Sequence, residues 1–522
     1  MKKLFTLSLT LTLLLFVGCR ADTQPIMEYQ STALIENVAE NPPEEAMFYE
    51  KPAYVYEETQ PEPDDEPLIE GDEPTIEELA FVQCDRRCFN PDAHLDNLPP
   101  EDLPICINLA AQFFTELCAL FTQDGGYLWG QSLHTPYIFL CPDTRYIVAN
   151  QPDSLGILHQ VGSVFVGKLP SDFPAAYSFP TIGDRQWAMV SWDFVPQETT
   201  IDEIARKRMM VHMSFHVQQD QLFGRDAGWD NAHMNRKENR ISIQLEINAL
   251  LRAMESTGDE RVNAAHDALA IRAARRDTRF LAHTTSEDAL EFNEGLANYT
   301  EVIISGISME DNLVWLRNSA ETIRYQQSLA GAFGYTTGEM YGHLLDYTGI
   351  DWRTGLRRRM DLGELLQNAL GIETLRTIDE VDLTLYGYEE IVAFETERTE
   401  AHAQLLEDIR IAFTTETTLH IPPGFLSGNL TLNPTRIHDL PGLGMAHGAN
   451  VVVSEPFGDL RTYDGFFMRN IDSATGQFSG TVVATGIQKD GNTVTAPGWV
   501  LHLNDGYGVR YENGHYVLFR EG

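Results

Sequence analysis

The sequence predicts an α+β protein, in which a mainly helical core follows an α+β N-terminal region and precedes a small antiparallel β module. Three observations lead to this prediction. Apolar residues recur at helical spacing through most of 201–375, as they do in amphipathic helices. Within 79–200, one such helix at 103–122 is followed by short apolar runs that Pro, Gly, Asp and Asn separate, as in strands joined by turns. From 417 to 522 the chain is rich in Gly, Thr, Val and aromatic residues, with hairpin turn signals between strand-like runs.

Individual elements follow from the same patterns. In the N-terminal region we expect strands at Tyr137–Cys141, Tyr146–Ala149, Val164–Val166 and Trp187–Trp192. In the helical core, 201–416, we expect helices near 201–222, 240–255, 261–281, 286–305, 310–329, 335–348 and 387–413. Thr285-Ser-Glu-Asp288 has the form of a capping box and predicts a helix start.

Residues 1–19 have the features of a lipoprotein signal peptide. Two lysines precede the apolar stretch Leu4–Val17, and Gly18-Cys19 follows it. The stretch is short for a membrane-spanning helix, and its basic flank is typical of a secretory signal. Phe16-Val-Gly-Cys19 resembles a lipobox, so Cys19 is expected to carry the lipid that anchors the protein to a membrane. A cleaved signal with an incidental Cys19 is the alternative. The protein is expected in the cell envelope, facing outside the cytoplasm.

Residues 20–78 are expected to form a disordered tether. The segment is rich in Asp, Glu and Pro, and its only basic residues are Arg20 and Lys51. Such a composition buries too little apolar surface to offset the loss of chain entropy on folding, and like charges extend the chain. The whole chain carries a formal net charge of −40, which argues against binding to nucleic acid.

The cysteines that follow Cys19 lie at positions 84, 88, 106, 118 and 141. An exported compartment permits disulfides, and an odd number of cysteines leaves at least one thiol free or paired elsewhere. Cys84 and Cys88 are four residues apart, but no second Cys/His pair has zinc-ribbon spacing. Disulfides or buried thiols are therefore expected, with a connectivity that the sequence does not specify.

His212 and His216 carry the clearest chemical signal. They are four residues apart in a predicted helix, so both imidazoles project from one face. That geometry suits two ligands on one Zn²⁺, which needs at least one further protein ligand. Glu294, on a separate predicted helix, can supply a carboxylate, and Asn298, one turn on, can accept a hydrogen bond from the non-ligating nitrogen of a histidine. The alternative is two surface or core histidines that share a helix face by chance.

Several segments, in order, resemble a family of exported bacterial proteins with a gluzincin-like metallopeptidase core. The family pattern runs HExx-Phe-His-x-x-Gln, Asn-Ala-His, Leu-Glu-x-x-Ala-Leu, Asn-Glu-Gly-Leu-Ala-Glu-Tyr, Tyr-x-x-Gly and Leu-Leu-Asp. The matching segments here, spread over roughly 130–410, are His212–Gln219, Asn231–His233, Leu245–Leu250, Asn293–Tyr299, Tyr335–Gly338 and Leu344–Asp346. The resemblance implies a zincin-like core in which His212, His216 and Glu294 bind zinc.

The chain departs from that pattern at two positions. The second residue of HExxH is the general base that takes a proton from the attacking water, and here it is Met213, whose thioether cannot accept a proton at neutral pH. Ser214 points elsewhere around the helix and is a poor base. Asn298 stands where the family has Glu. Zinc binding is therefore expected with weak or absent hydrolysis.

Other residues are weaker candidates for the site. Glu246 is an alternative third ligand, against the simpler interpretation of a carboxylate on a helix surface. His233 is expected to flank the site or, more simply, to hydrogen-bond the backbone of its loop. Tyr335, Tyr341 and His343 are candidates to stabilise a transition state, or else belong to the core or the rim of the cleft.

Three functions are consistent with these observations. The first is a zinc-dependent peptidase-like protein that acts outside the cell. The second is a pseudopeptidase, a protein of the same fold that binds a peptide or protein without cutting it. The third is a structural surface lipoprotein in which the histidine pair is incidental. Metal analysis separates the third from the first two, and a peptidase assay with zinc separates the first from the second.

Overall fold

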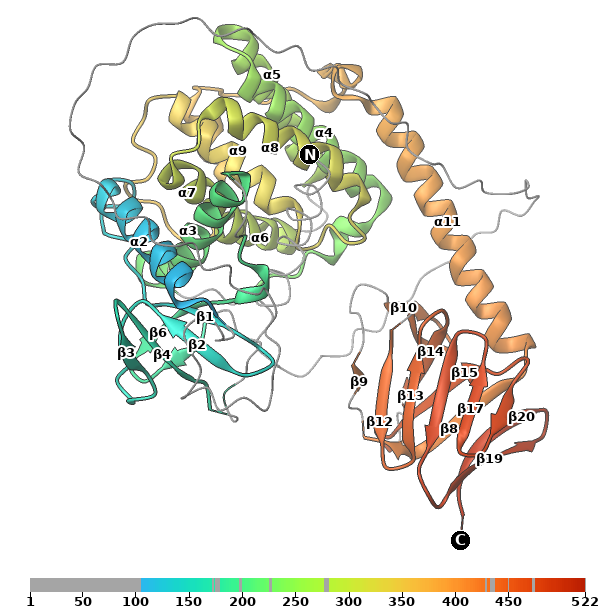
Figure 1. Ribbon diagram of the computed structural model, residues 1–522. Coiled ribbons are helices and arrows are strands. Elements are labelled where there is room, and N and C mark those ends of the chain that lie inside the picture. Colours follow the sequence, from blue (N-terminus) through green and yellow to red (C-terminus); the bar gives the residue numbers. More distant parts are fainter. Residues whose placement is uncertain are drawn as a thin grey trace, which may run out of the picture.

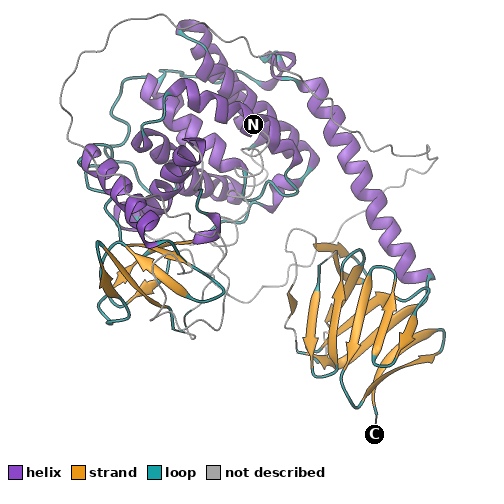
Figure 2. Cartoon of the chain, in the orientation of Figure 1, coloured by secondary structure: helices purple, strands orange, loops and turns teal. Residues whose placement is uncertain are grey.

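The computed structural model describes residues 105–521, apart from 171–172, 174–178, 197–199, 225–227, 277–280, 428–429, 432–436, 449 and 472–474. The expected signal peptide, Cys19, the tether and the cysteines at 84 and 88 lie outside the described residues. The predicted α+β class is confirmed: a small sheet with one helix, a bundle of helices and a β sandwich follow one another along the chain (Figures 1 and 2).

The N-terminal region is a five-stranded sheet covered by α2 (Ile107–Asp124). The sheet has the order β3-β4-β2-β1-β7, and its strands are β1 (Tyr137–Leu140), β2 (Tyr146–Ala149), β3 (His159–Val161), β4 (Val164–Lys168) and β7 (Ala188–Ser191). A two-stranded ribbon, β5 (Thr181–Ile182) and β6 (Arg185–Gln186), and the short helix η3 (Trp192–Phe194) complete it. All four predicted strands are present. The aromatic face of α2 packs on the sheet, and the rings of Phe114 and Phe139 stack with centroids 4.8 Å apart.

The helical core begins with α3 (Thr200–Phe223) and ends with α11 (Tyr388–Thr415). Between them lie η4 (Ala232–Asn235), α4 (Lys237–Glu255), α5 (Gly258–Arg275), α6 (Leu281–Leu290), η5 (Glu291–Gly295), α7 (Leu296–Ser305), α8 (Met309–Thr322), η6 (Ile323–Tyr325), α9 (Phe333–Tyr347), α10 (Leu362–Ala369), η7 (Ile378–Glu380) and η8 (Leu383–Tyr386). Every predicted helix has a counterpart. The predicted helix at 310–329 is shorter than expected, because α8 ends at Thr322.

The capping-box prediction was wrong. Thr285 and Asp288 lie inside α6, which already begins at Leu281. The carboxylate of Asp288 accepts hydrogen bonds from Arg272 and Arg276 instead of capping a helix end. Asp288 therefore forms ion pairs with distant arginines and not the helix cap that the local pattern predicted.

Glycines bring the backbones of η5 and α9 into direct contact. A Cβ atom added to Gly295 would lie 2.4 Å from the Cα of Gly338, and one added to Gly338 would lie 2.6 Å from the carbonyl oxygen of Glu291. Such distances are too short for any larger residue at either position without a backbone shift. The Asn-Glu-Gly and Tyr-Thr-Thr-Gly segments thus meet face to face, and this contact fixes the position of η5.

The C-terminal region is a sandwich of two β sheets. The seven-stranded sheet has the order β10-β11-β14-β15-β8-β20-β19, and the six-stranded sheet has the order β16-β17-β18-β13-β12-β9. The strands are β8 (Thr418–Leu426), β9 (Leu430–Thr431), β10 (Ile437–Leu440), β11 (Gly444–Gly448), β12 (Val452–Glu455), β13 (Gly458–Thr462), β14 (Phe466–Ile471), β15 (Phe478–Val483), β16 (Gln488–Asp490), β17 (Thr493–Ala496), β18 (Trp499–Leu503), β19 (Tyr507–Glu512) and β20 (His515–Arg520). The predicted antiparallel module is confirmed, with one exception: β8 and β20 pair in parallel. Asn513 and Gly514 both have positive φ and form the predicted hairpin turn.

The long helix α11 connects the helical core to the sandwich (Figure 1). Its first turns pack on the core through the buried Ile391 and Glu395, and its end packs on the sandwich through the buried Ile409. Residues 399–404, between these two contacts, are exposed. Within the described part of the chain, no helix is long and apolar enough to span a membrane.

Candidate metal centre

The two histidines predicted as ligands lie side by side on α3. Their Nε2 atoms are 2.9 Å apart, as expected for imidazoles one helical turn apart on a single face. Both side chains are buried, with 1% of His212 and 8% of His216 exposed. Because both rings are buried from water, their facing Nε2 atoms need a polar partner within the protein.

Glu294 supplies that partner. Its Oε2 lies 3.5 Å from His212 Nε2 and 3.2 Å from His216 Nε2. The three ligand atoms all lie within 4.8 Å of one another, and all three side chains are buried. The predicted convergence of His212, His216 and Glu294 is therefore present in the structure, and we call these residues the metal cluster.

A π-helical turn presents Glu294 to the histidines. Residues 291–295 form η5, a single π-helical segment between α6 and α7. Such insertions shift the side chains that follow around the helix axis and are frequent at functional sites. The glycine contact with α9 holds this turn in place.

The cluster fits a tetrahedral metal ion. Ligands bound at 2.0–2.2 Å to a tetrahedral Zn²⁺ stand about 3.4 Å from one another. The two histidine–carboxylate distances, 3.5 and 3.2 Å, are close to this value, and the histidine–histidine distance of 2.9 Å needs only a small widening. The donor set of two imidazoles and one carboxylate leaves a fourth position open.

The second ring nitrogen of His212 is held by Glu301. Nδ1 of His212 lies 3.1 Å from Glu301 Oε2, and Arg208 donates a 2.8 Å hydrogen bond to the other carboxylate oxygen. This arrangement directs Nε2 of His212 toward the metal position. The predicted role of Asn298 was wrong: its amide donates to the backbone oxygen of Tyr335, 3.3 Å away. The sequence pointed to Glu301 only as a weak candidate for the missing base and not as the partner of His212, although Glu301 lies seven residues after Glu294, on the same helix face.

His216 is fixed through Gln219. Nδ1 of His216 lies 3.2 Å from the amide oxygen of Gln219. The amide nitrogen of Gln219 donates to the carbonyl oxygens of Phe292 and Asn293 in η5, at 2.9 and 3.1 Å. One side chain therefore connects the helix that carries the histidines to the turn that carries Glu294.

The neighbouring carboxylates stabilise the protonated form of His212 in the metal cluster. Burial lowers the pKa of His212, but hydrogen bonds and charges from Glu294 and Glu301 outweigh burial and raise this pKa to about 9. Burial likewise raises the pKa of Glu294, but His216 and His212 hold that pKa well below its usual range. Binding of a metal ion requires neutral imidazoles, so the ion must displace this proton.

Met213 lies in the hydrophobic core next to these ligands, with 2% of its surface exposed. Neither carboxylate that could replace the missing base is free to do so. Glu291 is bound to Arg272, with its Oε2 2.5 Å from the guanidinium, and Glu301 is bound to Arg208 and His212. Among the described residues, no further carboxylate joins the metal cluster.

The proposed transition-state stabilisers have different surroundings. The ring of Tyr335 is parallel to the imidazole of His212, with centroids 6.1 Å apart and 6° between the planes, so it lies beside the cluster. The hydroxyl of Tyr341 instead donates to Glu246, 2.8 Å away. His343 is buried against the ring of Tyr299, and burial, together with the charge of Arg208, lowers its pKa to about 3.

The other candidate ligands belong to a separate buried group, which we call the arginine network. Arg272, Arg275 and Arg276 form ion pairs there with Glu246, Glu287, Asp288, Glu291 and Asp361. Glu246 is therefore neither a metal ligand nor a surface carboxylate, and the charges of Arg275 and Arg272 hold its pKa below the usual value against the effect of burial. The ring of His233 lies 2.7 Å from the carboxylate of Glu287. The expected partner, the backbone of its own loop, was therefore wrong.

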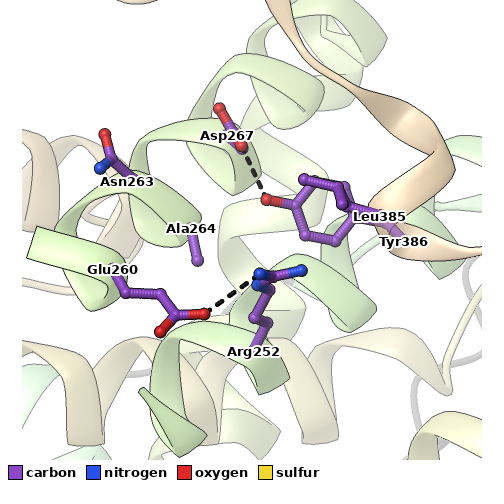
Figure 3. Close-up of a pocket in the computed structure, with 7 residues that line it drawn as sticks. All are labelled: Arg252, Glu260, Asn263, Ala264, Asp267, Leu385 and Tyr386. Atoms are coloured by element: carbon purple, nitrogen blue, oxygen red, sulfur yellow. Dashed lines mark hydrogen bonds and ion pairs between the residues drawn. The ribbon is translucent and has the colours of Figure 1, made fainter. Parts of the chain in front are cut away.

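A surface pocket with a volume of 370 Å³ lies elsewhere in the helical core (Figure 3). Arg252, Glu260, Asp267 and Tyr386 are among its lining residues. Arg252 donates to Glu260 and Tyr386 donates to Asp267, so these four side chains form two pairs within the pocket. The pocket shares no residue with the metal cluster.

The cysteines of this region also have defined states. Cys106 is disulfide-bonded, whereas Cys118 is an exposed thiol outside any disulfide, as the odd number of cysteines predicted for at least one residue.

Comparison of the chain with protein-family models, with curated proteins and with solved structures gives no match. The geometry of the metal cluster therefore carries the functional argument.

Proposed function

We propose that this chain is a zinc-binding, metallopeptidase-like protein of the cell envelope with little or no peptidase activity. The observation that supports the proposal best is the metal cluster itself: two histidines and a glutamate, all buried, point their ligand atoms at one position. A chance pair of core histidines would supply only two ligand atoms, whereas a zinc site needs at least a third, which Glu294 provides here.

The donor set favours zinc over other common metals. Two imidazole nitrogens and one carboxylate oxygen match the His₂Glu set of catalytic zinc sites, and Mg²⁺ and Ca²⁺ prefer oxygen ligands alone. The hydrogen bonds of Glu301 and Gln219 to the outer ring nitrogens are also typical of zinc histidines. The proposal therefore includes both the ligands and the residues that orient them.

Weak hydrolysis follows from Met213. Peptide hydrolysis needs a group that takes a proton from water and delivers it to the leaving amine, and such a group contributes about 10²- to 10⁴-fold to the rate. Met213 cannot do so, and the nearby Glu291 and Glu301 are engaged by arginines. The alternative function, binding of a peptide or protein without cleavage, retains the same zinc site. The lipid anchor on Cys19 would hold either form of the protein at a membrane.

The deciding experiment combines metal analysis with a peptidase assay. We expect the purified natural protein to bind one zinc ion and to show little cleavage of a mixed peptide library. Met213→Glu should raise cleavage by at least about 100-fold, because it restores the base. Met213→Gln is the matched control, since it adds polarity without a base, and Met213→Glu combined with His216→Ala tests whether the gain depends on the metal cluster.

The outcomes separate the alternatives. Absence of bound zinc in the natural protein would rule out the proposal and leave a structural lipoprotein. Cleavage by the natural protein at ordinary metallopeptidase rates, unchanged in Met213→Glu, would mean that the base lies outside the motif. Circular dichroism identifies any variant that fails to fold.

A further inference from the structure

A second group of reactive side chains lies apart from the metal cluster. Sγ of Cys118, on α2, lies 3.5 Å from Nε2 of His134, in the loop between α2 and β1. The other ring nitrogen of His134, Nδ1, lies 2.7 Å from Oγ of Ser132. All three residues are exposed, and Cys118 is outside any disulfide. A nucleophile, a base and a residue that orients the base are thus in contact, in that order.

The imidazole of His134 is held in place from several sides. The ring of the buried Phe121 packs edge-on against it, with centroids 5.5 Å apart. The backbone oxygen of His134 accepts a 3.1 Å hydrogen bond from Gln218 of α3, and the next residue, Thr135, is buried and bonded to the same glutamine. The loop that carries the base is therefore anchored to the helical core.

The hydrogen bonds allow the tautomer of His134 in which Nε2 acts as the base. Oγ of Ser132 accepts the backbone N–H of His134 at 3.3 Å, and its second lone pair can accept Nδ1–H. With the ring proton on Nδ1, Nε2 is left as the acceptor that faces the thiol of Cys118. Transfer of the thiol proton to Nε2 gives a thiolate beside an imidazolium, the pair that activates cysteine nucleophiles.

We propose that Cys118 is a site of thiol–disulfide exchange with small disulfide compounds, and that His134 is its base. The thiol proton of Cys118 moves to His134 Nε2, and Sγ attacks one sulfur of the disulfide. A new Sγ–S bond forms, the original S–S bond breaks, and the departing thiolate takes the proton from the imidazolium. Cys118 is oxidised and the small disulfide is reduced, so the disulfide itself supplies the oxidising equivalents. The metal cluster takes no part in the exchange.

The test measures the rate at which the full-length protein reacts with the neutral disulfide dithiodipyridine, which releases an absorbing thione. EDTA is present throughout, and the rate of Cys118→Ser, which reports all other thiols, is subtracted. The rate of a thiol without a base falls with its thiolate fraction between pH 8 and pH 6. We expect the rate of the natural protein to fall less over this range than the rate of His134→Gln, which should react at least about tenfold more slowly than the natural protein at pH 6.

Two further variants complete the test. His159→Gln removes an exposed histidine of β3 and should leave the rate unchanged, and Ser132→Ala should lower the rate less than His134→Gln. Peptide mass spectrometry identifies the modified cysteine. Absence of modification at Cys118, or equal rates and pH profiles in the natural protein and His134→Gln, would overturn the proposal. Because the reaction is measured without metal, failure here would leave the zinc proposal intact.

Discussion

The metal cluster and the arginine network are both buried groups of ionised side chains in one helical core, but they balance their charges differently. The arginine network places three permanently charged guanidinium groups among its carboxylates. In the metal cluster, Oε2 of Glu294 lies beside two imidazoles, whose charge depends on a bound proton. A carboxylate balanced by arginine has no need of a metal ion, whereas one balanced by histidine can exchange protons for a metal ion. This difference favours Glu294 over Glu246 as the candidate metal ligand.

The largest expected effect concerns the arginine network. Arg272→Met removes one guanidinium, so the buried Glu291 loses its main partner and Glu246 keeps only one of its two arginines. Removal of one partner of a buried ion pair costs about 3–5 kcal/mol, so the free energy of unfolding should fall by that amount. Urea denaturation of the full chain measures it. Arg410→Met, at a weak and partly exposed pair with Glu407 on α11, should change stability little, and an equal loss in both variants would contradict the comparison.

The next largest effect is on metal binding. Glu294→Gln keeps the volume of the side chain but removes its negative charge, so zinc affinity measured by competition with a chelator should fall by at least about 100-fold, more than the typical cost of losing a supporting hydrogen bond. Glu246→Gln changes the same kind of residue in the arginine network and should leave zinc affinity unchanged. The reverse result would make Glu246 the ligand.

A smaller effect is expected from Glu301. Glu301→Gln weakens the contact that orients His212, and such a change typically costs about 10- to 100-fold in metal affinity. Asn298→Ala, a substitution on the same helix, should cost less, because the amide of Asn298 bonds a backbone oxygen instead of a histidine. Equal losses in the two variants would return Asn298 to the role that the sequence suggested for it.

The smallest effect is the pH dependence that distinguishes a proton-balanced cluster from an arginine-balanced one. In the metal-free protein the pKa of His212 is raised from 6.5 to about 9, so its stabilising contribution is full below pH 6.5 and is lost as the pH rises through about 9. Zinc affinity should change in the opposite direction and rise by up to about tenfold between pH 7 and pH 8, because each bound ion displaces a proton. Unfolding and zinc titrations at those pH values measure both trends; a zinc affinity independent of pH would contradict the assignment.

Much of this structure was predictable because the relevant patterns are local. Helical periodicity placed the helices of the core, and alternating runs with turn residues between them placed the strands of the N-terminal sheet and of the sandwich. The spacing of His212 and His216 was sufficient to put both rings on one helix face, since that face depends only on the geometry of the helix. The odd number of cysteines likewise predicted a thiol such as Cys118 outside any disulfide.

Long-range contacts decided the rest. The sequence favoured Glu294 over Glu246 as the third ligand but left both open, and the position of Arg272 and Arg275 beside Glu246 separates their roles. Glu301 lies seven positions after Glu294. Both can reach α3 because α3 and α7 run antiparallel, with Arg208 opposite Glu301 and Gln219 opposite Phe292.

The sequence by itself thus determined the class of the fold, the pair of histidines and the absence of a base at Met213, because each depends on residues close together in the chain. Only the tertiary structure decided that Glu301, and not Asn298, orients His212, that Asp288 forms ion pairs instead of capping α6, and that His134 lies against Cys118. Each of these outcomes depends on which side chain lies within hydrogen-bonding distance of a partner on another packed element. Periodicity gives the direction in which a side chain points, but it does not give the distance to a group on another helix or loop.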